Sequence, residues 1–331
     1  MSTKIELRLS EKYRPVDFEH IIGQKEVISK INNTLDRNEV VHYIFYGSSG
    51  TGKTTMAYII ARKLFGENWR ENTPEYNSSD ERKLETFRDK IIPALRTRGR
   101  RVIILDEADG ITFDSQQALR TPMEKTLGTS LILLVNDASK ITDALKSRAV
   151  EITFDRLSDD DVMQIISKII IGEKLEFKFS NDEEKKKILD GIKYLVKSSN
   201  GDARKAINRL ETIINAKKEI TVENIMSLER PKYAFNALIL AIEGKFFEGQ
   251  RMVEDAYINY GFSNEVILEE FYDGLHSENI DSEVRIKLFA ELKELDKNLK
   301  MTYKPLYQFV GFLAKAWIFN HLPKGCPQKA N

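Results

Sequence analysis

The sequence has little cysteine and no long apolar run. Its single cysteine, Cys326, stands near the C-terminal end, so one chain can form neither a disulfide framework nor a cysteine-based metal site. No stretch of about 18 apolar residues occurs, which predicts that no helix spans a membrane. The N-terminal segment also lacks the apolar core of a signal peptide. We therefore expect a cytoplasmic protein, or a nuclear one in a eukaryotic cell.

An excess of either charge is also absent. The 51 Lys and Arg residues balance the 51 Asp and Glu residues. This balance excludes a uniformly basic protein that coats nucleic acid, but it leaves room for a local basic patch. A chain of 331 residues, 41% of them hydrophobic, can form two or three soluble domains with sizeable cores.

The first part of the chain alternates between strand and helix patterns. Residues 41–46, 101–105 and 131–135 are apolar runs without polar alternation, which is typical of parallel strands buried on both faces. A helix pattern follows the first run over residues 54–65. We therefore predict an α/β domain with a parallel sheet over residues 1–155.

The remainder reads as helical. Amphipathic patterns cover residues 157–171, 183–198 and 202–214, with Asp202 as the expected N-cap of the last. Beyond residue 228 the pattern stays helical, with breaks near glycines and a proline: Gly244, Gly261 and Pro305. These patterns predict a helical domain over residues 156–228 and an all-α domain over residues 229–331.

One motif points directly to phosphate. The eight residues after the first strand match the pattern G-x-x-x-x-G-K-[ST]; they are Gly47, Ser48, Ser49, Gly50, Thr51, Gly52, Lys53 and Thr54. The glycines let backbone N–H groups turn toward phosphate oxygens, and the following helix directs its positive end at the anion. Lys53 would supply a charge to the β- and γ-phosphates, and the Thr54 hydroxyl would bind Mg²⁺.

A pair of carboxylates follows the second apolar run. Asp106 and Glu107 stand where a parallel strand ends, at the edge of the sheet where ligands of such folds bind. Asp106 would hold Mg²⁺ directly or through water, and Glu107 would orient and deprotonate an attacking water. The pair favours nucleotide hydrolysis over transfer of a phosphoryl group to a small metabolite.

Several further motifs resemble the AAA+ ATPases of the clamp-loader branch, in particular the small subunits of archaeal replication factor C. The resemblance spans nearly the whole chain. The motifs that carry it, besides the phosphate loop, cover residues 11–15, 22–24, 65–70, 77–82, 105–109, 117–120, 147–148 and 201–206. It implies an AAA+ parallel-sheet module with a helical lid, followed by an all-α collar that joins subunits.

The resemblance also implies roles for individual residues, with ATP and Mg²⁺ as cofactors. Asn136 matches the sensor that polarises the hydrolytic water, and Arg204 matches a second sensor that reaches the γ-phosphate from the lid. Arg148 matches the arginine finger, which enters the neighbouring subunit's site. The residues that match the nucleotide-binding segments, besides the phosphate loop and Asp106, are Tyr13, Arg14, Pro15, Ile22, Gly23 and Thr55.

Three departures from the family pattern stand out. Ser48 and Ser49 replace two prolines, and because both positions contribute backbone groups we expect nucleotide binding to survive. Ala149 replaces a cysteine beside the retained Arg148. Pro122 follows Thr121, where the family has a second arginine; a proline inside a helix removes a hydrogen bond and kinks the helix unless the helix ends there, which puts a role of Arg120 between subunits in doubt.

A local basic stretch is the candidate DNA contact. Residues 82–101 hold eight basic and two acidic side chains. In the family, the helix at this position lines a chamber around duplex DNA, so Arg82, Lys83 and Arg88 are candidates for phosphate contacts that carry no base code. A solubilising helix face is the alternative interpretation.

The resemblance thus predicts an ATPase subunit of a DNA sliding-clamp loader. ATP binding would open the clamp and grip primer–template DNA, and hydrolysis would release the closed clamp. Expected partners are the replication factor C large subunit and other small subunits in a five-membered ring, the clamp PCNA, and DNA. Two alternatives stay open: a non-catalytic scaffold paralogue in the same ring, or another AAA+ DNA motor such as a Holliday-junction helicase.

Overall fold

The structure is a computed structural model that describes residues 7–36, 40–78, 85, 87–126, 128–175, 181–228, 231–276 and 280–321. The chain divides into two compact units, Met1–Leu228 and Glu229–Asn331, which are described separately. Within these described ranges, none of the helices has the length and apolar character needed to cross a membrane. The division into three domains stays a prediction.

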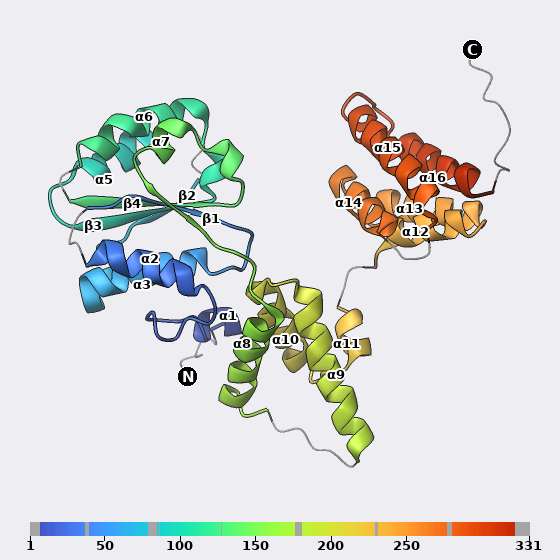
Figure 1. The fold of residues 1–331 in the computed structure, drawn as a ribbon, viewed down its shortest axis with the longest axis horizontal. Coiled ribbons are helices and arrows are strands. Elements are labelled where there is room, and N and C mark those ends of the chain that lie inside the picture. Colours follow the sequence, from blue (N-terminus) through green and yellow to red (C-terminus); the bar gives the residue numbers. More distant parts are fainter. Residues whose placement is uncertain are drawn as a thin grey trace, which may run out of the picture. The chain divides into compact units, whose positions relative to one another are not determined.

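A five-stranded parallel sheet forms the centre of the first unit (Figure 1). Its strands lie in the order β2-β3-β4-β1-β5. Their bounds are Tyr43–Tyr46 for β1, Glu75–Asn77 for β2, Arg101–Asp106 for β3, Thr129–Val135 for β4 and Val150–Thr153 for β5. The α/β parallel-sheet prediction is confirmed. The two edge strands β2 and β5 were not predicted, because they are short and mostly exposed.

Both faces of the sheet are covered, which explains the apolar runs without alternation. Figure 1 shows α2 and α3 on one face and α5, α6 and α7 on the other. Successive residues of β1 point to opposite sides: Phe45 packs in the core beneath α2 and α3, and Ile44 packs in the core beneath α5 and α6. The helices around the sheet are α2 (Lys25–Leu35), α3 (Lys53–Phe65), η1 (Gly66–Trp69), η2 (Phe87–Ile91), α5 (Ile92–Arg96), η3 (Ala108–Gly110), α6 (Phe113–Glu124), η4 (Ala138–Lys140) and α7 (Asp143–Lys146).

A separate helical core follows the sheet within the first unit. Its helices are α8 (Asp159–Gly172), α9 (Asp182–Ser199), α10 (Ala203–Asn215) and α11 (Val222–Met226). The first three match the predicted helices to within two residues, whereas α11 was not predicted. The Asp202 side chain accepts from Lys205 N at 2.9 Å as the predicted N-cap of α10. The short N-terminal helix α1 (Leu9–Lys12) packs into the same core through Leu9.

The second unit is a helical bundle, as predicted. Its helices are α12 (Tyr233–Ile242), α13 (Phe246–Ile258), α14 (Asn264–Leu275), α15 (Ser282–Leu299) and α16 (Pro305–His321). The predicted breaks at Gly244, Gly261 and Pro305 fall between or at the start of these helices. In α16, Phe309, Phe312 and Leu313 are buried in the bundle core.

The proline in α6 does not end its helix. Pro122 lies inside α6, which continues to Glu124, and Lys125 N still donates to Thr121 O at 3.1 Å. Only the bond that the missing N–H would have made is lost, because Pro122 stands near the end of the helix. Arg120 donates to Gln117 Oε1 at 3.0 Å on an exposed surface, and its role between subunits stays a prediction.

Candidate nucleotide site

The phosphate loop joins β1 to α3 in the conformation that its glycines require. Gly50 has φ +72° and Gly52 has φ +102°, both in the left-handed region that side chains rarely adopt. A Cβ atom at Gly50 would also overlap Asp202 Oδ1, which belongs to the N-cap of α10. The loop therefore needs glycine at position 50 for two reasons, backbone conformation and the close approach of the lid.

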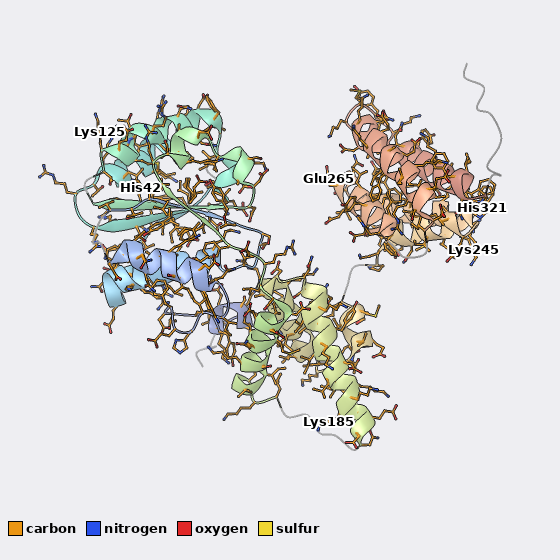
Figure 2. The ribbon with its side chains drawn as sticks, viewed as in Figure 1. His42, Lys125, Lys185, Lys245, Glu265 and His321 are labelled. Carbon is orange, nitrogen blue, oxygen red and sulfur yellow. The ribbon has the colours of Figure 1, made fainter. Side chains whose placement is uncertain are left out.

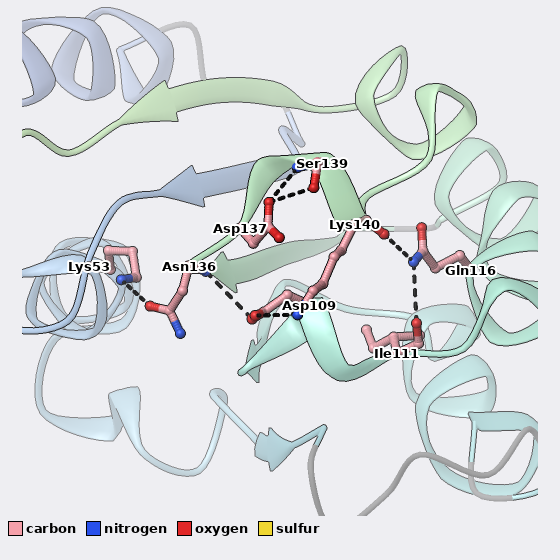
Figure 3. Close-up of polar contacts among 8 residues, drawn as sticks. All are labelled: Lys53, Asp109, Ile111, Gln116, Asn136, Asp137, Ser139 and Lys140. Atoms are coloured by element: carbon pink, nitrogen blue, oxygen red, sulfur yellow. Dashed lines mark hydrogen bonds and ion pairs between the residues drawn. The ribbon is translucent and has the colours of Figure 1, made fainter. Parts of the chain in front are cut away.

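Lys53 lies at the bottom of the loop. Its Nζ donates to Gly47 O at 2.6 Å and to Ser48 O at 2.9 Å. It also donates to Asn136 Oδ1 at 3.0 Å (Figure 3). Burial lowers the pKa of Lys53 below its ordinary value, while the charges of Asp106 and Asp109 oppose that shift. The ammonium group is thus held toward the loop by neutral acceptors, for which phosphate oxygens would be stronger substitutes.

The end of β3 supplies the two predicted carboxylates. Glu107 N donates to Asp106 Oδ1 at 2.8 Å, which fixes the Asp106 side chain at the strand end. Glu107 has φ +52°, an uncommon conformation for a residue with a long side chain. Strands β3, β4 and β1 are neighbours, so their carboxyl ends bring Asp106, Asn136 and the phosphate loop to one edge of the sheet.

A polar network behind Asn136 was not predicted (Figure 3). Asp109 accepts weakly from Asn136 N at 3.5 Å and lies 3.9 Å from Lys140 Nζ. Gln116 is buried in α6; its amide donates to Lys140 O at 2.9 Å and more weakly to Ile111 O at 3.3 Å, and its Oε1 accepts from Thr142 N at 2.9 Å. Gln116 therefore fixes the loop after β3 against the loop after β4. A single glutamine in a helix pattern gives no sequence signal of this kind.

The N-terminal segment approaches the site from the side of the lid. Tyr13 OH donates to Glu173 Oε1 at 2.7 Å, and partial burial together with this hydrogen bond raises the pKa of Tyr13 to about 12. The Arg14 guanidinium lies 5.2 Å from the centre of the Tyr58 ring and pairs with Glu11. Gln24, which belongs to the motif at residues 22–24 but had no predicted role, donates to Asp155 O at 2.7 Å. The segment is thus attached to the helical core as well as to the sheet domain.

One cavity of about 230 Å³ brings most of the predicted residues together. Those that line it are Tyr13, Arg14, Pro15, Ile22, Ser49, Gly50, Thr51, Gly52, Lys53, Thr54, Thr55, Asp106, Glu107, Asn136 and Arg204. Gly47 and Ser48 lie beside it and bond Lys53, and Gly23 precedes Gln24 of the lining. Residues from five segments of the chain thus converge on this cavity, while their individual roles stay predictions.

The helical core closes one side of this cavity. Ala203 N, at the start of α10, donates to Gly50 O at 3.3 Å. Arg204 follows directly and lines the cavity. The contact between Gly50 and α10 therefore sets where Arg204 enters the cavity.

Arg148 lies outside the cavity of its own chain. It follows α7, and its guanidinium bonds Ala144 O at 2.6 Å and pairs with Glu124. The role of Arg148 as an arginine finger in a neighbouring subunit's site stays a prediction. Of the DNA candidates, Arg88 is exposed on η2, whereas Arg82 and Lys83 lie outside the described residues.

Comparison with known proteins agrees with this geometry. Residues 43–156 match the ATPase family associated with various cellular activities (AAA). A solved structure of the Holliday junction branch migration motor RuvB from Thermotoga maritima is similar with a TM-score of 0.52 over 78% of this chain and 85% of that chain. At 18% identity, this likeness shows the fold alone. The fold and site define an AAA+ ATPase with a parallel-sheet module, a helical lid and a C-terminal helical bundle.

The curated relatives narrow the class. The replication factor C small subunit of Sulfolobus acidocaldarius is 34% identical over 94% of this chain and 95% of the relative. That of Archaeoglobus fulgidus is 33% identical over 92% of this chain and 95% of the relative. The chain belongs to the replication factor C small subunits, so it is an ATP-hydrolysing subunit of the clamp-loader type.

Proposed function

We propose that this chain is a catalytic subunit of a ring that loads a sliding clamp onto DNA. Its partners are the replication factor C large subunit and other small subunits in a five-membered ring, the clamp PCNA, and primer–template DNA, in the cytoplasm. The observation that carries the catalytic assignment is that the phosphate loop, the strand-end carboxylates, Asn136 and Arg204 meet in one cavity. A scaffold paralogue would not need this full set.

The loop and Lys53 hold the phosphates of ATP. The phosphate loop and the first turn of α3 line the cavity, so their N–H groups would bind the phosphates, and Lys53 would exchange loop carbonyls for phosphate oxygens. Thr54 and Asp106 line the same cavity and offer the oxygen ligands that Mg²⁺ prefers, so these residues fit that ion. An Mg²⁺ ion held by these residues would neutralise negative charge on the phosphates.

Hydrolysis uses the groups around the far end of the triphosphate. Glu107 orients the attacking water and accepts its proton, and Asn136 helps to position that water. Arg204 reaches the γ-phosphate from α10, so it links the state of the nucleotide to the position of the lid. The adenosine part of ATP is held by the N-terminal segment, through Tyr13, Arg14, Pro15, Ile22 and Gly23.

The arginine finger completes the site from the neighbouring subunit. The position of Arg148, outside the cavity of its own chain, supports this role, since a group that acts in cis would line that cavity. A finger supplied by a partner accelerates hydrolysis by about 10³–10⁵-fold in GTPase systems. Hydrolysis then depends on correct assembly of the ring.

The ATP cycle drives the clamp. ATP binding arranges the ring so that it opens the clamp and grips primer–template DNA, and hydrolysis releases the closed clamp. Phosphate contacts from Arg82, Lys83 and Arg88 make DNA binding independent of sequence, as a loader that acts at any primer requires.

The test is Glu107→Gln in the assembled ring with clamp and primed DNA. The amide keeps the shape but cannot accept the proton, so ATP binding by calorimetry should be retained while turnover falls by about 10²-fold or more. Glu183→Gln, an exposed change on α9, is the matched control. Wild-type turnover by the Glu107 variant would refute the catalytic assignment and favour the scaffold alternative; strand displacement by the wild-type ring would favour a motor.

A further inference from the structure

The guanidinium group of Arg148 is held within its own chain on one edge only. Its Nη1 donates to Ala144 O at 2.6 Å and Ser147 Oγ at 3.1 Å, and its Nη2 pairs with the carboxylate of Glu124. The Nε atom is buried and makes no hydrogen bond to any described residue. An arginine held this way leaves one donor unsatisfied, and a buried donor without a partner carries a desolvation cost. The pose is therefore incomplete by itself.

The partner carboxylate stands where helix stability does not favour it. Glu124 is the last residue of α6, and the C-terminal end of a helix carries partial negative charge. Repulsion from that charge makes an acid at this position unfavourable unless a cation is near. Arg148, whose side chain is 21% exposed, supplies that cation to the 49% exposed Glu124. The pair thus explains why an acid is tolerated at this helix end.

A buried histidine fixes the spacing between the two partners. His42, labelled in Figure 2, bonds Met123 O through Nε2 at 2.9 Å and accepts from Leu131 N through Nδ1 at 3.0 Å. Its own carbonyl accepts from Val150 N at 2.8 Å. Met123 precedes Glu124, and Val150 lies two residues after Arg148. The side chain and backbone of His42 therefore hold the segments that carry Glu124 and Arg148 against the sheet.

We propose that Glu124 is a positioning residue that retains Arg148 on its own subunit until a neighbour's triphosphate takes the guanidinium. This inference rests on the proposed role of Arg148 as a finger that acts in trans. The half-exposed ion pair is weak, because solvent screens it, whereas a triphosphate offers several anionic oxygens and can satisfy donors that the retained pose leaves open. Glu124 accordingly sets the fraction of Arg148 side chains that are free to enter the neighbouring subunit's nucleotide site.

The experiment compares Glu124→Gln with wild type in the full ring with large subunit, clamp and primed DNA. Glutamine keeps the size and a hydrogen-bond acceptor but removes the charge. Because a partly exposed pair of this kind shifts an equilibrium by only a small factor, we expect kcat for ATP hydrolysis to rise about two- to five-fold. The KM for ATP and the nucleotide affinity of the isolated subunit should stay unchanged. Glu183→Gln, which removes an exposed pair with Lys187 on α9, is the matched control.

The same change in an Arg148→Ala background identifies the route of the effect. If Glu124 acts through Arg148, adding Glu124→Gln to Arg148→Ala leaves kcat unchanged. In the wild-type background, Glu124→Asp gives a kcat between that of wild type and that of Glu124→Gln. An unchanged or lowered kcat in the single Glu124→Gln variant, or an equal rise in both backgrounds, would overturn the retention role. If Arg148→Ala itself leaves ring turnover at the wild-type level, the proposed finger role is wrong and the retention role fails with it.

Discussion

A methyl group at position 50 should separate the lid from the phosphate loop. Gly50→Ala places a Cβ atom on Asp202 Oδ1, which cannot retreat without giving up its bond to Lys205 N. Gly52→Ala is the matched control, because Gly52 is also left-handed yet a Cβ atom there meets nothing within 4 Å. The backbone strain of about 1–2 kcal/mol is therefore common to both variants.

The difference between the two variants measures the contact with the lid. Loss of the N-cap costs about 1 kcal/mol, and loss of the bond from Ala203 N to Gly50 O about 1 kcal/mol more. For a unit of this size, an extra 2 kcal/mol lowers Tm by about 4–8 °C beyond the shift of Gly52→Ala. The assay is scanning calorimetry of the full chain without nucleotide. Equal shifts for the two variants would refute the idea that Asp202 and Gly50 form a close, ordered contact.

Three further predictions concern stability and DNA binding. Burial lowers the pKa of His42 below 6.5, so the unfolded chain binds more protons than the native one and the free energy of unfolding falls as the pH drops below about 6.5. This contribution is at most about 1.4 kcal/mol per pH unit. Urea unfolding at several pH values should show it in the wild type but not in His42→Gln, and identical pH profiles for the two proteins would contradict this. Gln116→Ala leaves Thr142 N and Lys140 O without their side-chain partner and should cost about 2–4 kcal/mol in urea unfolding. Gln117→Ala, at the partly buried neighbour whose oxygen accepts from Arg120, should cost less than about 1 kcal/mol, and equal losses would argue against the bridging role. Lys83→Ala and Arg88→Ala should each reduce the salt slope of DNA binding by the assembled ring by about 1, and an unchanged slope would return these residues to a solvated surface.

Local chemistry explains why much of the site was predictable. The phosphate loop can be recognised from a few consecutive residues, because the loop needs glycines to turn and Lys53 to bind phosphate. The acids after an apolar run can be recognised in the same way, because they stand where a buried strand ends. Asp202 was recognisable as an N-cap for the same reason. Parallel strands end at one edge of a sheet, so the convergence of Asp106 and Asn136 followed from strand type alone.

Other features depended on which distant segments meet. The edge strands β2 and β5 gave no signal, since three or four partly exposed residues become a strand only when a neighbouring strand supplies hydrogen bonds. Gln116 and His42 are ordinary residues in sequence. Gln116 acquires partners in the loop of Lys140 and Thr142, and His42 acquires partners in α6 and β4, all far along the chain.

The sequence alone therefore determined the three central strands, the main helices, the phosphate loop and the family, because these depend on short-range patterns of size, polarity and backbone freedom. Only the tertiary structure decided that α10 closes on Gly50 and that Arg148 rests against Glu124. Those contacts join residues 24 or more positions apart, and no local pattern encodes them, because they arise from the packing of whole helices against the sheet.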